Sequence, residues 1–256
     1  MDRKVFIERA SGLTFTVWIS PSLSKWPMAA SKMDRIGMGA IAGIPHEWTL
    51  AEVPAYYKKR FGVRQLEFRS NHFESLETPY LEMLRGKIRS SESSLVNVQV
   101  DTSYDLASAD EVERQRSLDH VKKWMDAIAY LGSECVRINP GRGSGSVEKS
   151  IESMIEVNGY ARSKKLVLLT ENHFGIGMNP DIHVRIMPYA YLISAKAMLF
   201  NGQMEQLSYD FDRYVQMAEK AGFKGIYSVE QWAPPYQDLD FEKAADWLID
   251  RVKRNI

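Results

Sequence analysis

Two apolar runs in the second half of the chain each end in a glutamate, and together they decide the fold. Residues 166–173 read LVLLTENH, with a carboxylate at Glu171, and residues 225–232 read GIYSVEQW, with a carboxylate at Glu230. Short apolar runs are typical of strands buried on both faces of a parallel sheet. The carboxyl ends of such strands form the rim at which parallel barrels build their active sites. A carboxylate there must be solvated, paired or bound to a cation, so we expect one shared acid/base or metal site.

Working outward from these runs, strand-like and helix-like stretches alternate from about residue 35 onward. The spacing from strand to helix to strand predicts a parallel sheet with right-handed crossovers. The number of units favours an α/β fold of the (β/α)₈ TIM-barrel type. We expect strands at 36–41, 63–68, 95–101, 135–138, 166–170, 191–198 and 226–229, and helices at 49–61, 78–89, 109–131, 147–160, 210–221 and 241–252.

One stretch does not fit a regular barrel. Between Glu171 and Ser194 a complete barrel needs a helix, a strand, a second helix and the next strand, but the sequence offers only residues 181–187 followed by Pro188. We therefore expect a barrel that is incomplete or irregular around strands 5–7. No low-complexity linker interrupts the rest, which predicts one barrel domain over residues 35–256.

The charge balance disfavours a nucleic-acid-binding protein. The chain has 33 Lys and Arg residues and 33 Asp and Glu residues among its 256, so it has no net field to attract phosphate. Cys135 is the only cysteine, which excludes an intrachain disulfide and a multi-cysteine zinc site. Within its apolar run it is expected to be a core residue of a strand. The sequence does not fix the oligomeric state and is compatible with a homo-oligomer.

The first 31 residues differ in character from the rest. A basic start, Arg3-Lys4-Val5-Phe6-Ile7, precedes a short apolar stretch at 12–19 and small residues at 28–31. This layout predicts an export signal and a periplasmic or exported protein, and the start resembles a twin-arginine signal with Lys4 in place of the second arginine. The alternative is an N-terminal arm packed on the domain of a cytoplasmic protein. The apolar stretch is too short to span a bilayer.

Several segments in order resemble the xylose isomerase-like TIM-barrel superfamily, in its sugar phosphate isomerase/epimerase branch. The likeness covers roughly residues 35–255. The segments that carry it are FRSNHFES at 68–75, the helix and VRINPG at 117–141, TENHFG at 170–175, SAK at 194–196 and AEKAGFKGIYSVEQ at 218–231.

The resemblance implies a sugar or sugar-phosphate isomerase or epimerase, with lyase chemistry as a variant. Such enzymes move a proton between carboxylates beside a sugar carbonyl, with a divalent cation (Mn²⁺, Mg²⁺ or Zn²⁺) polarising the oxygen. Relatives hold the cation with two glutamates, an aspartate and a histidine. Glu171 and Glu230 match the two glutamates and are the expected catalytic and metal-binding residues. Ser194 stands at the histidine position, and the aspartate segment is absent with the missing unit.

Further residues near strand ends are candidates for binding a carbohydrate substrate. The alternatives are structural. His72 can be a solvent-facing loop residue and Asp101 a loop cap. Lys196 can pair with a glutamate, and Trp232 can either stack on a sugar ring or pack at the rim. The candidates are His72, Asp101, Asn139, His173, Lys196 and Trp232.

Two other functions remain open from the sequence. The first is a divergent barrel with a degenerate metal site, which binds carbohydrate or a partner without isomerase activity. In that case Glu171 and Glu230 only form salt bridges to Arg or Lys at the rim. The second is a DNA-repair endonuclease of similar fold. The zero net charge and five scattered histidines argue against it, because a trinuclear zinc site needs more ligands.

Overall fold

The computed structural model describes most of the barrel. The residues it describes are 15–18 (backbone alone), 31–39, 48–101, 104–141, 145–171, 190–196, 210–230 and 240–256. His173, Trp232 and most of the first 31 residues lie outside these ranges. Within the described residues, no helix is long and apolar enough to cross a membrane.

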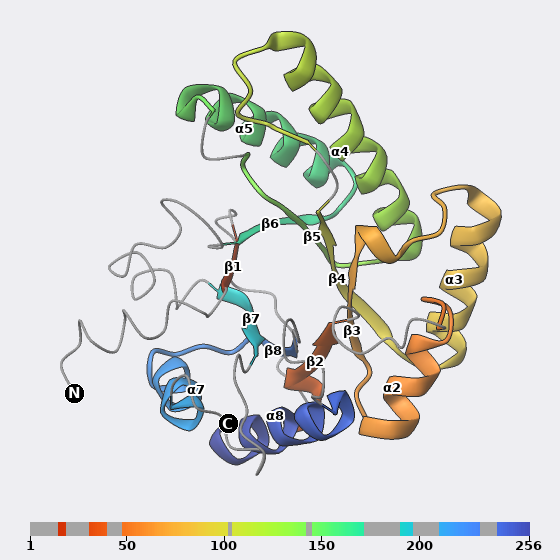
Figure 1. Cartoon of the computed structure of the whole chain (residues 1–256), viewed down its shortest axis with the longest axis vertical. Helices are drawn as coiled ribbons and strands as arrows, with labels where there is room; N and C mark the ends of the chain where they lie inside the picture. The colour runs from red at the N-terminus through yellow and green to blue at the C-terminus, as the bar shows by residue number, and fades with distance from the viewer. Residues whose placement is uncertain are drawn as a thin grey trace.

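The described strands close into a barrel in the order β1-β6-β5-β4-β3-β2-β8-β7 (Figure 1). Seven of them run parallel, as the sequence pattern predicts, and the expected strands at 135–138 and 226–229 form over those residues. The strands are β1 (Phe15–Trp18), β2 (Ile36–Gly39), β3 (Gln65–Arg69), β4 (Ser94–Val100), β5 (Cys135–Ile138), β6 (Val167–Glu171), β7 (Ala190–Ala195) and β8 (Ile226–Val229).

The predicted irregularity around strands 5–7 is confirmed. It consists of an antiparallel strand from the N-terminal part of the chain. Strand β1 lies between β6 and β7 and runs antiparallel to both, with Thr16 opposite Glu171 on one side and Leu192 on the other. Without it, β6 and β7 would each present an edge of unpaired N–H and C=O groups, which is costly when buried. Strand β1 belongs to the segment for which the sequence predicts an export signal or an arm, and export stays a prediction.

The described helices lie on the outside of the strands (Figure 1). The longest, α4, begins at an Asp110 cap whose side chain accepts from the N–H groups of Val112 and Glu113, and it ends at Gly132 in the left-handed region (φ 81°). The helices are α2 (Val53–Phe61), α3 (Thr78–Ser90), α4 (Glu111–Leu131), α5 (Val147–Ser163), α7 (Phe211–Lys220) and α8 (Phe241–Asn255), with short 3₁₀ turns η2 (Lys32–Arg35) and η3 (Ser70–His72).

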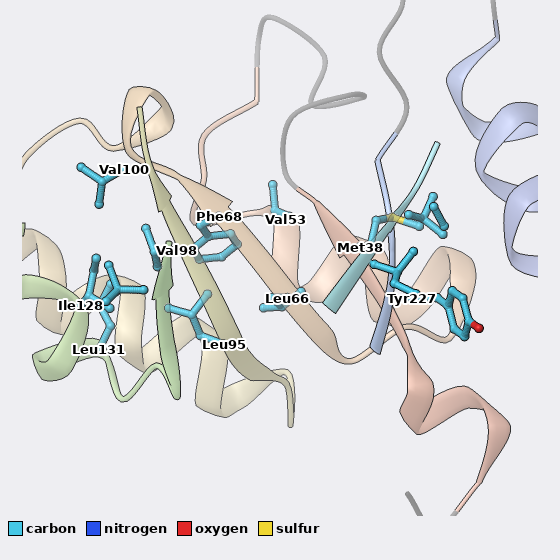
Figure 2. Packing of buried hydrophobic residues seen from close by; sticks show 14 of the residues in the cluster. Met38, Val53, Leu66, Phe68, Leu95, Val98, Val100, Ile128, Leu131 and Tyr227 are labelled. Atoms are coloured by element: carbon cyan, nitrogen blue, oxygen red, sulfur yellow. The ribbon is translucent and has the colours of Figure 1, made fainter. Parts of the chain in front are cut away.

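The main core lies between the outer face of the strands and the helices. Leu66 and Phe68 of β3 and Val98 of β4 are fully buried, and Figure 2 shows them in one packed layer with Ile128 of α4. Because side chains alternate across a strand, residues between these positions point into the barrel lumen. The outer face is therefore apolar, and the polar residues of the same strands line the lumen.

A smaller apolar cluster includes Cys135 and Leu169 and is separate from the main core. Cys135 is a free, fully buried thiol, and burial raises its pKa well above its ordinary value. The prediction that it is a core residue of a strand is confirmed. It shares a strand face with Arg137 and lies two residues nearer the amino end of β5.

Candidate functional site

Polar and charged side chains fill the lumen from the middle of the strands to their carboxyl ends. They occupy alternate positions of the strands or the first residue beyond them, so they share the inner face. Hydrogen bonds and ion pairs link most of them. The residues are Glu67 and Arg69 of β3, Asn97, Gln99 and Asp101 on and after β4, Arg137 of β5, Glu171 of β6, Ser194 and Lys196 on and after β7, and Ser228 and Glu230 on and after β8.

Arg137 is the central cation of one half of the site. Its guanidinium donates to Asp101 Oδ1 at 2.5 Å and to Gln99 Oε1 at 2.7 Å, and it pairs with Glu171 Oε2. Burial alone would lower the pKa of Arg137, but the carboxylates of Glu171 and Asp101 raise it above its ordinary value. The buried guanidinium is therefore firmly charged and neutralises the carboxylates beside it.

Asp101 lies between two arginines. It also accepts from Arg69 Nε at 2.6 Å, and its N–H donates to Ser70 Oγ at 2.8 Å. Burial would raise the pKa of Asp101, but Arg137 and Arg69 outweigh it, so the pKa lies below its ordinary value of 3.8. Asp101 is thus ionised and paired at neutral pH.

Glu230 and Lys196 form the opposite half of the site. The Lys196 ammonium lies 3.6 Å from Glu230 Oε1, and both side chains are about nine-tenths buried. The other carboxylate oxygen, Glu230 Oε2, is buried and has no hydrogen-bond partner among the described residues. One oxygen of this carboxylate is thus neutralised by a cation, and the other is available to a ligand or to water.

Other buried polar atoms in and around the lumen also have no hydrogen-bond partner among the described residues. An unsatisfied buried polar atom costs on the order of 1–3 kcal/mol, so a polar ligand reaching these atoms would gain that free energy. This concentration of available donors and acceptors favours a binding site for a hydroxyl-rich molecule. The atoms are His72 Nδ1, Asn97 Oδ1, Arg137 Nε and Asn139 Oδ1.

The structure brings several of the predicted site residues into this region. Glu171 and Asp101 meet through Arg137, and Glu230 meets Lys196 in the ion pair that the sequence left as an alternative. Asn139 follows β5, and its N–H donates to the Tyr104 hydroxyl at 2.8 Å.

Two of the predicted residues are histidines. His72 ends η3 and is half-buried, and burial followed by the nearby Arg69 lowers its pKa. It is therefore neutral near pH 7. The candidate at position 173 lies outside the described residues, as does Trp232.

Sequence reasoning missed Glu67, Gln99 and Ser228. A signal existed, because polar residues alternate with apolar ones along strands 65–69 and 94–100. On a half-exposed sheet such residues face solvent, whereas in a parallel barrel whose outer face is covered by helices they must line the lumen. The predicted barrel therefore implies that Glu67 and Gln99 face the lumen.

The described donors do not fit a divalent cation. No group of three or more His, Cys, Asp or Glu side chains in the described residues is placed to hold a metal ion. Glu171 is paired with Arg137 and Glu230 lies beside Lys196, while Ser194 supplies a buried hydroxyl at the position of the family histidine. Each expected carboxylate ligand thus already has a cation from the chain itself.

The comparison with known families agrees with this architecture. The family profile described as "Xylose isomerase-like TIM barrel" matches residues 57–193, more than half of the chain. The chain belongs to this family. A search of curated proteins gave no match.

Solved structures of similar fold include two epimerases and a xylose isomerase-like barrel. The 3-keto-D-glucoside 4-epimerase from E. coli is 14% identical, with a TM-score of 0.59 over 84% of this chain and 98% of its own. The D-psicose 3-epimerase from Clostridium cellulolyticum, solved with D-tagatose, is 12% identical, with a TM-score of 0.63 over 86% and 99%. A xylose isomerase-like barrel from Mycobacterium smegmatis, in complex with magnesium, is 11% identical, with a TM-score of 0.55 over 86% and 97%. At these identities the likeness shows the fold.

Proposed function

We propose that this protein is a sugar or sugar-phosphate isomerase or epimerase that acts by carboxylate-mediated proton transfer. Family membership and the epimerases among the structural neighbours support this reaction class. The observation that carries the proposal is Glu230, a buried carboxylate at the end of a barrel strand with one oxygen beside an ammonium and the other available. That is the arrangement a general base needs at the mouth of a parallel barrel.

The two halves of the site have different roles in proton transfer. Glu230 Oε2 removes the proton next to the sugar carbonyl, because it has no competing partner among the described residues. The Lys196 ammonium lies beside this base and stabilises the negative charge that develops on the carbonyl oxygen. Glu171, held through one oxygen by Arg137, is the second carboxylate. It takes up a proton from water and delivers it to the sugar carbon, while Glu230 releases the proton it removed to water.

The remaining candidates bind and orient the sugar. Asn139 Oδ1 and His72 Nδ1 are buried acceptors or donors without partners in the described chain, so each can satisfy a sugar hydroxyl. Asp101 holds Arg137 in place and is less available to substrate, because two arginines already occupy it. His173 and Trp232 remain proposed substrate contacts on their sequence positions alone.

A second candidate function is carbohydrate binding without turnover. The observation that favours it is the double pairing of Arg137 with Glu171 and Asp101, because a carboxylate that already holds a guanidinium is less available to a substrate. In that case the lumen would bind sugar hydroxyls through the same available atoms, and Glu171 would serve only to hold the arginine.

Isotope exchange separates the two candidates. Purified protein is incubated in D₂O with a panel of aldoses, ketoses and their phosphates, and proton NMR follows loss of the C–H signal beside the carbonyl. We expect exchange with at least one sugar, reduced at least 100-fold in Glu230→Gln and in Glu171→Gln. Glu156→Gln is the matched control, because Glu156 pairs with Lys122 on the helical surface. Sugar binding without exchange would favour the second function, and the absence of both would refute the proposal.

A metal titration in the same preparation tests the cation that the family resemblance implies. A ligand that binds only the folded state raises the melting temperature. Mn²⁺, Mg²⁺ and Zn²⁺ are added in turn to chelator-treated protein, and to Glu171→Gln. Stabilisation that disappears in the variant would place a metal at Glu171, with further ligands from outside the described residues.

A further inference from the structure

Glu67 is a carboxyl group with no cationic partner among the described residues. It lies in the middle of β3, is 0% exposed, and its hydrogen bonds all come from neutral side chains. Asn97 Nδ2 and Gln99 Nε2 donate to Oε1 at 2.7 Å and 2.8 Å, and the Ser228 hydroxyl lies 2.6 Å from Oε2. The other carboxylates of the lumen, by contrast, each lie beside an arginine or a lysine.

The first line of contacts from Glu67 leads to Glu171. Gln99 donates its amide N–H to Glu67 and accepts on its amide oxygen from Arg137. Arg137 in turn pairs with Glu171. Because an amide has one donor side and one acceptor side, the carboxyl group of Glu67 fixes which side of Gln99 faces the guanidinium.

The second line leads to Glu230. Ser228 and Glu230 are two residues apart at the end of β8, so they point to the same side. Strand β2 lies between β3 and β8, with Gly39 opposite Glu67 and Gly37 opposite Ser228. Glycine leaves this part of the lumen without a side chain, which lets Glu67 and Ser228 meet across β2. A Cβ added at Gly39 would come within 3.9 Å of the Glu230 side chain, so this face of β2 adjoins the general base.

We propose that Glu67 is a positioning residue that holds both candidate catalytic glutamates, Glu171 through Gln99 and Arg137, and Glu230 through Ser228 at the end of β8. This inference rests on the proposed function for its catalytic meaning. Stability alone does not account for a carboxyl group here, because burying one costs free energy relative to an apolar side chain. Burial, followed by the charge of Glu230, raises the pKa of Glu67 above its ordinary value, although its three donors oppose that shift.

Three variants test the positioning role. Glu67→Gln keeps the shape and can still accept from Gln99 while donating to Ser228, whereas Ser228→Ala and Gln99→Leu each cut one line of contacts. We expect Gln99→Leu and Ser228→Ala to lower kcat for isotope exchange at least tenfold, with KM changed less than threefold. Glu67→Gln should stay within about threefold of wild type. Ser153→Ala is the matched control, because Ser153 is equally buried but lies on α5 and contacts Arg114.

A second readout does not depend on turnover. The buried Arg137 guanidinium should give slowly exchanging side-chain N–H signals in ¹⁵N NMR. We expect these signals in wild type and Glu67→Gln and their loss in Gln99→Leu. If Gln99→Leu and Ser228→Ala keep kcat within twofold, or if Glu67→Gln loses as much activity as they do, the positioning role is refuted. If wild type exchanges no sugar proton, the proposed function fails, and the guanidinium signals alone decide whether the line of contacts from Glu67 through Gln99 holds Arg137.

Discussion

Replacing Arg137 with methionine tests the charge balance of the lumen most directly. Methionine fills much of the same volume but removes the guanidinium that pairs with Glu171 and Asp101. Asp101 keeps Arg69 at 2.6 Å, so the variant leaves mainly Glu171 as an uncompensated buried charge. Glu171 is 8% exposed in its side chain, so water replaces only a small part of the lost pairing.

The structure sets the size of this effect. Removing one partner of a buried ion pair costs about 3–5 kcal/mol. Here only one carboxylate, that of Glu171, loses its cation. Against a total stability of about 5–15 kcal/mol, that is a large share. For a chain of this length each kcal/mol lowers Tm by roughly 2–4 °C, so we expect Arg137→Met to melt roughly 6–20 °C below wild type.

Equilibrium unfolding in urea at pH 7 measures the loss, and the double variant Arg137→Met/Glu171→Gln identifies its cause. If the stranded charge is the reason, neutralising Glu171 should recover more than half of the lost stability. Arg254→Met is the control, because Arg254 pairs with Asp250 on an exposed helical surface, and such pairs are worth about 0.3–0.5 kcal/mol. A loss below about 1 kcal/mol in Arg137→Met, or no recovery in the double variant, would refute the reasoning.

Three further outcomes are expected. Gly86 lies on the exposed face of α3 with open space around an added Cβ, so Gly86→Ala should raise the free energy of unfolding in urea by about 0.5–1 kcal/mol. Gly132 has a φ of 81°, so Gly132→Ala should lower it by about 1–2 kcal/mol. Equal effects of the two substitutions would contradict the backbone argument. Deleting residues 1–31 removes β1, so Tm should fall and a hydrophobic dye should bind; an unchanged Tm would show that β1 does not close the barrel. The pKa of Asp101 is lower in the folded state than its ordinary 3.8, so the stabilisation from its ion pairs is present above pH 3.8 and is lost as the pH falls through the folded value. The difference in stability between wild type and Asp101→Asn should therefore shrink below about pH 4. A difference that stays constant with pH would contradict the pairing.

Much of the fold could be predicted because its signals are local. Short runs rich in apolar residues predicted strands β5 and β8 over the residues where they form. Periodicity predicted the parallel barrel and the irregularity after Glu171. Helix α2 begins at Val53 rather than at the expected Thr49, because Pro54 fits the first turn of a helix and the preceding residues form a turn.

The candidate site could be predicted only in part. The sequence placed Glu171 and Glu230 at the carboxyl ends of strands, and the structure places them there. It left open whether they bind a metal or pair with basic residues. In the structure Arg137 and Lys196 lie beside them, on neighbouring strands.

The sequence by itself determined the alternation of strands and helices, the parallel barrel and the strand ends that carry the two glutamates, because each depends on residues a few positions apart. Only the tertiary structure decided that a strand from the N-terminus completes the ring and that Glu171 and Glu230 each lie beside a cation of the chain itself. It also decided that Glu67 contacts both Gln99 and Ser228. Those features join residues that are 30 to more than 150 positions apart, for example Glu67 and Ser228. Pairings at that distance form only when the barrel closes and brings strands that are far apart in the sequence side by side.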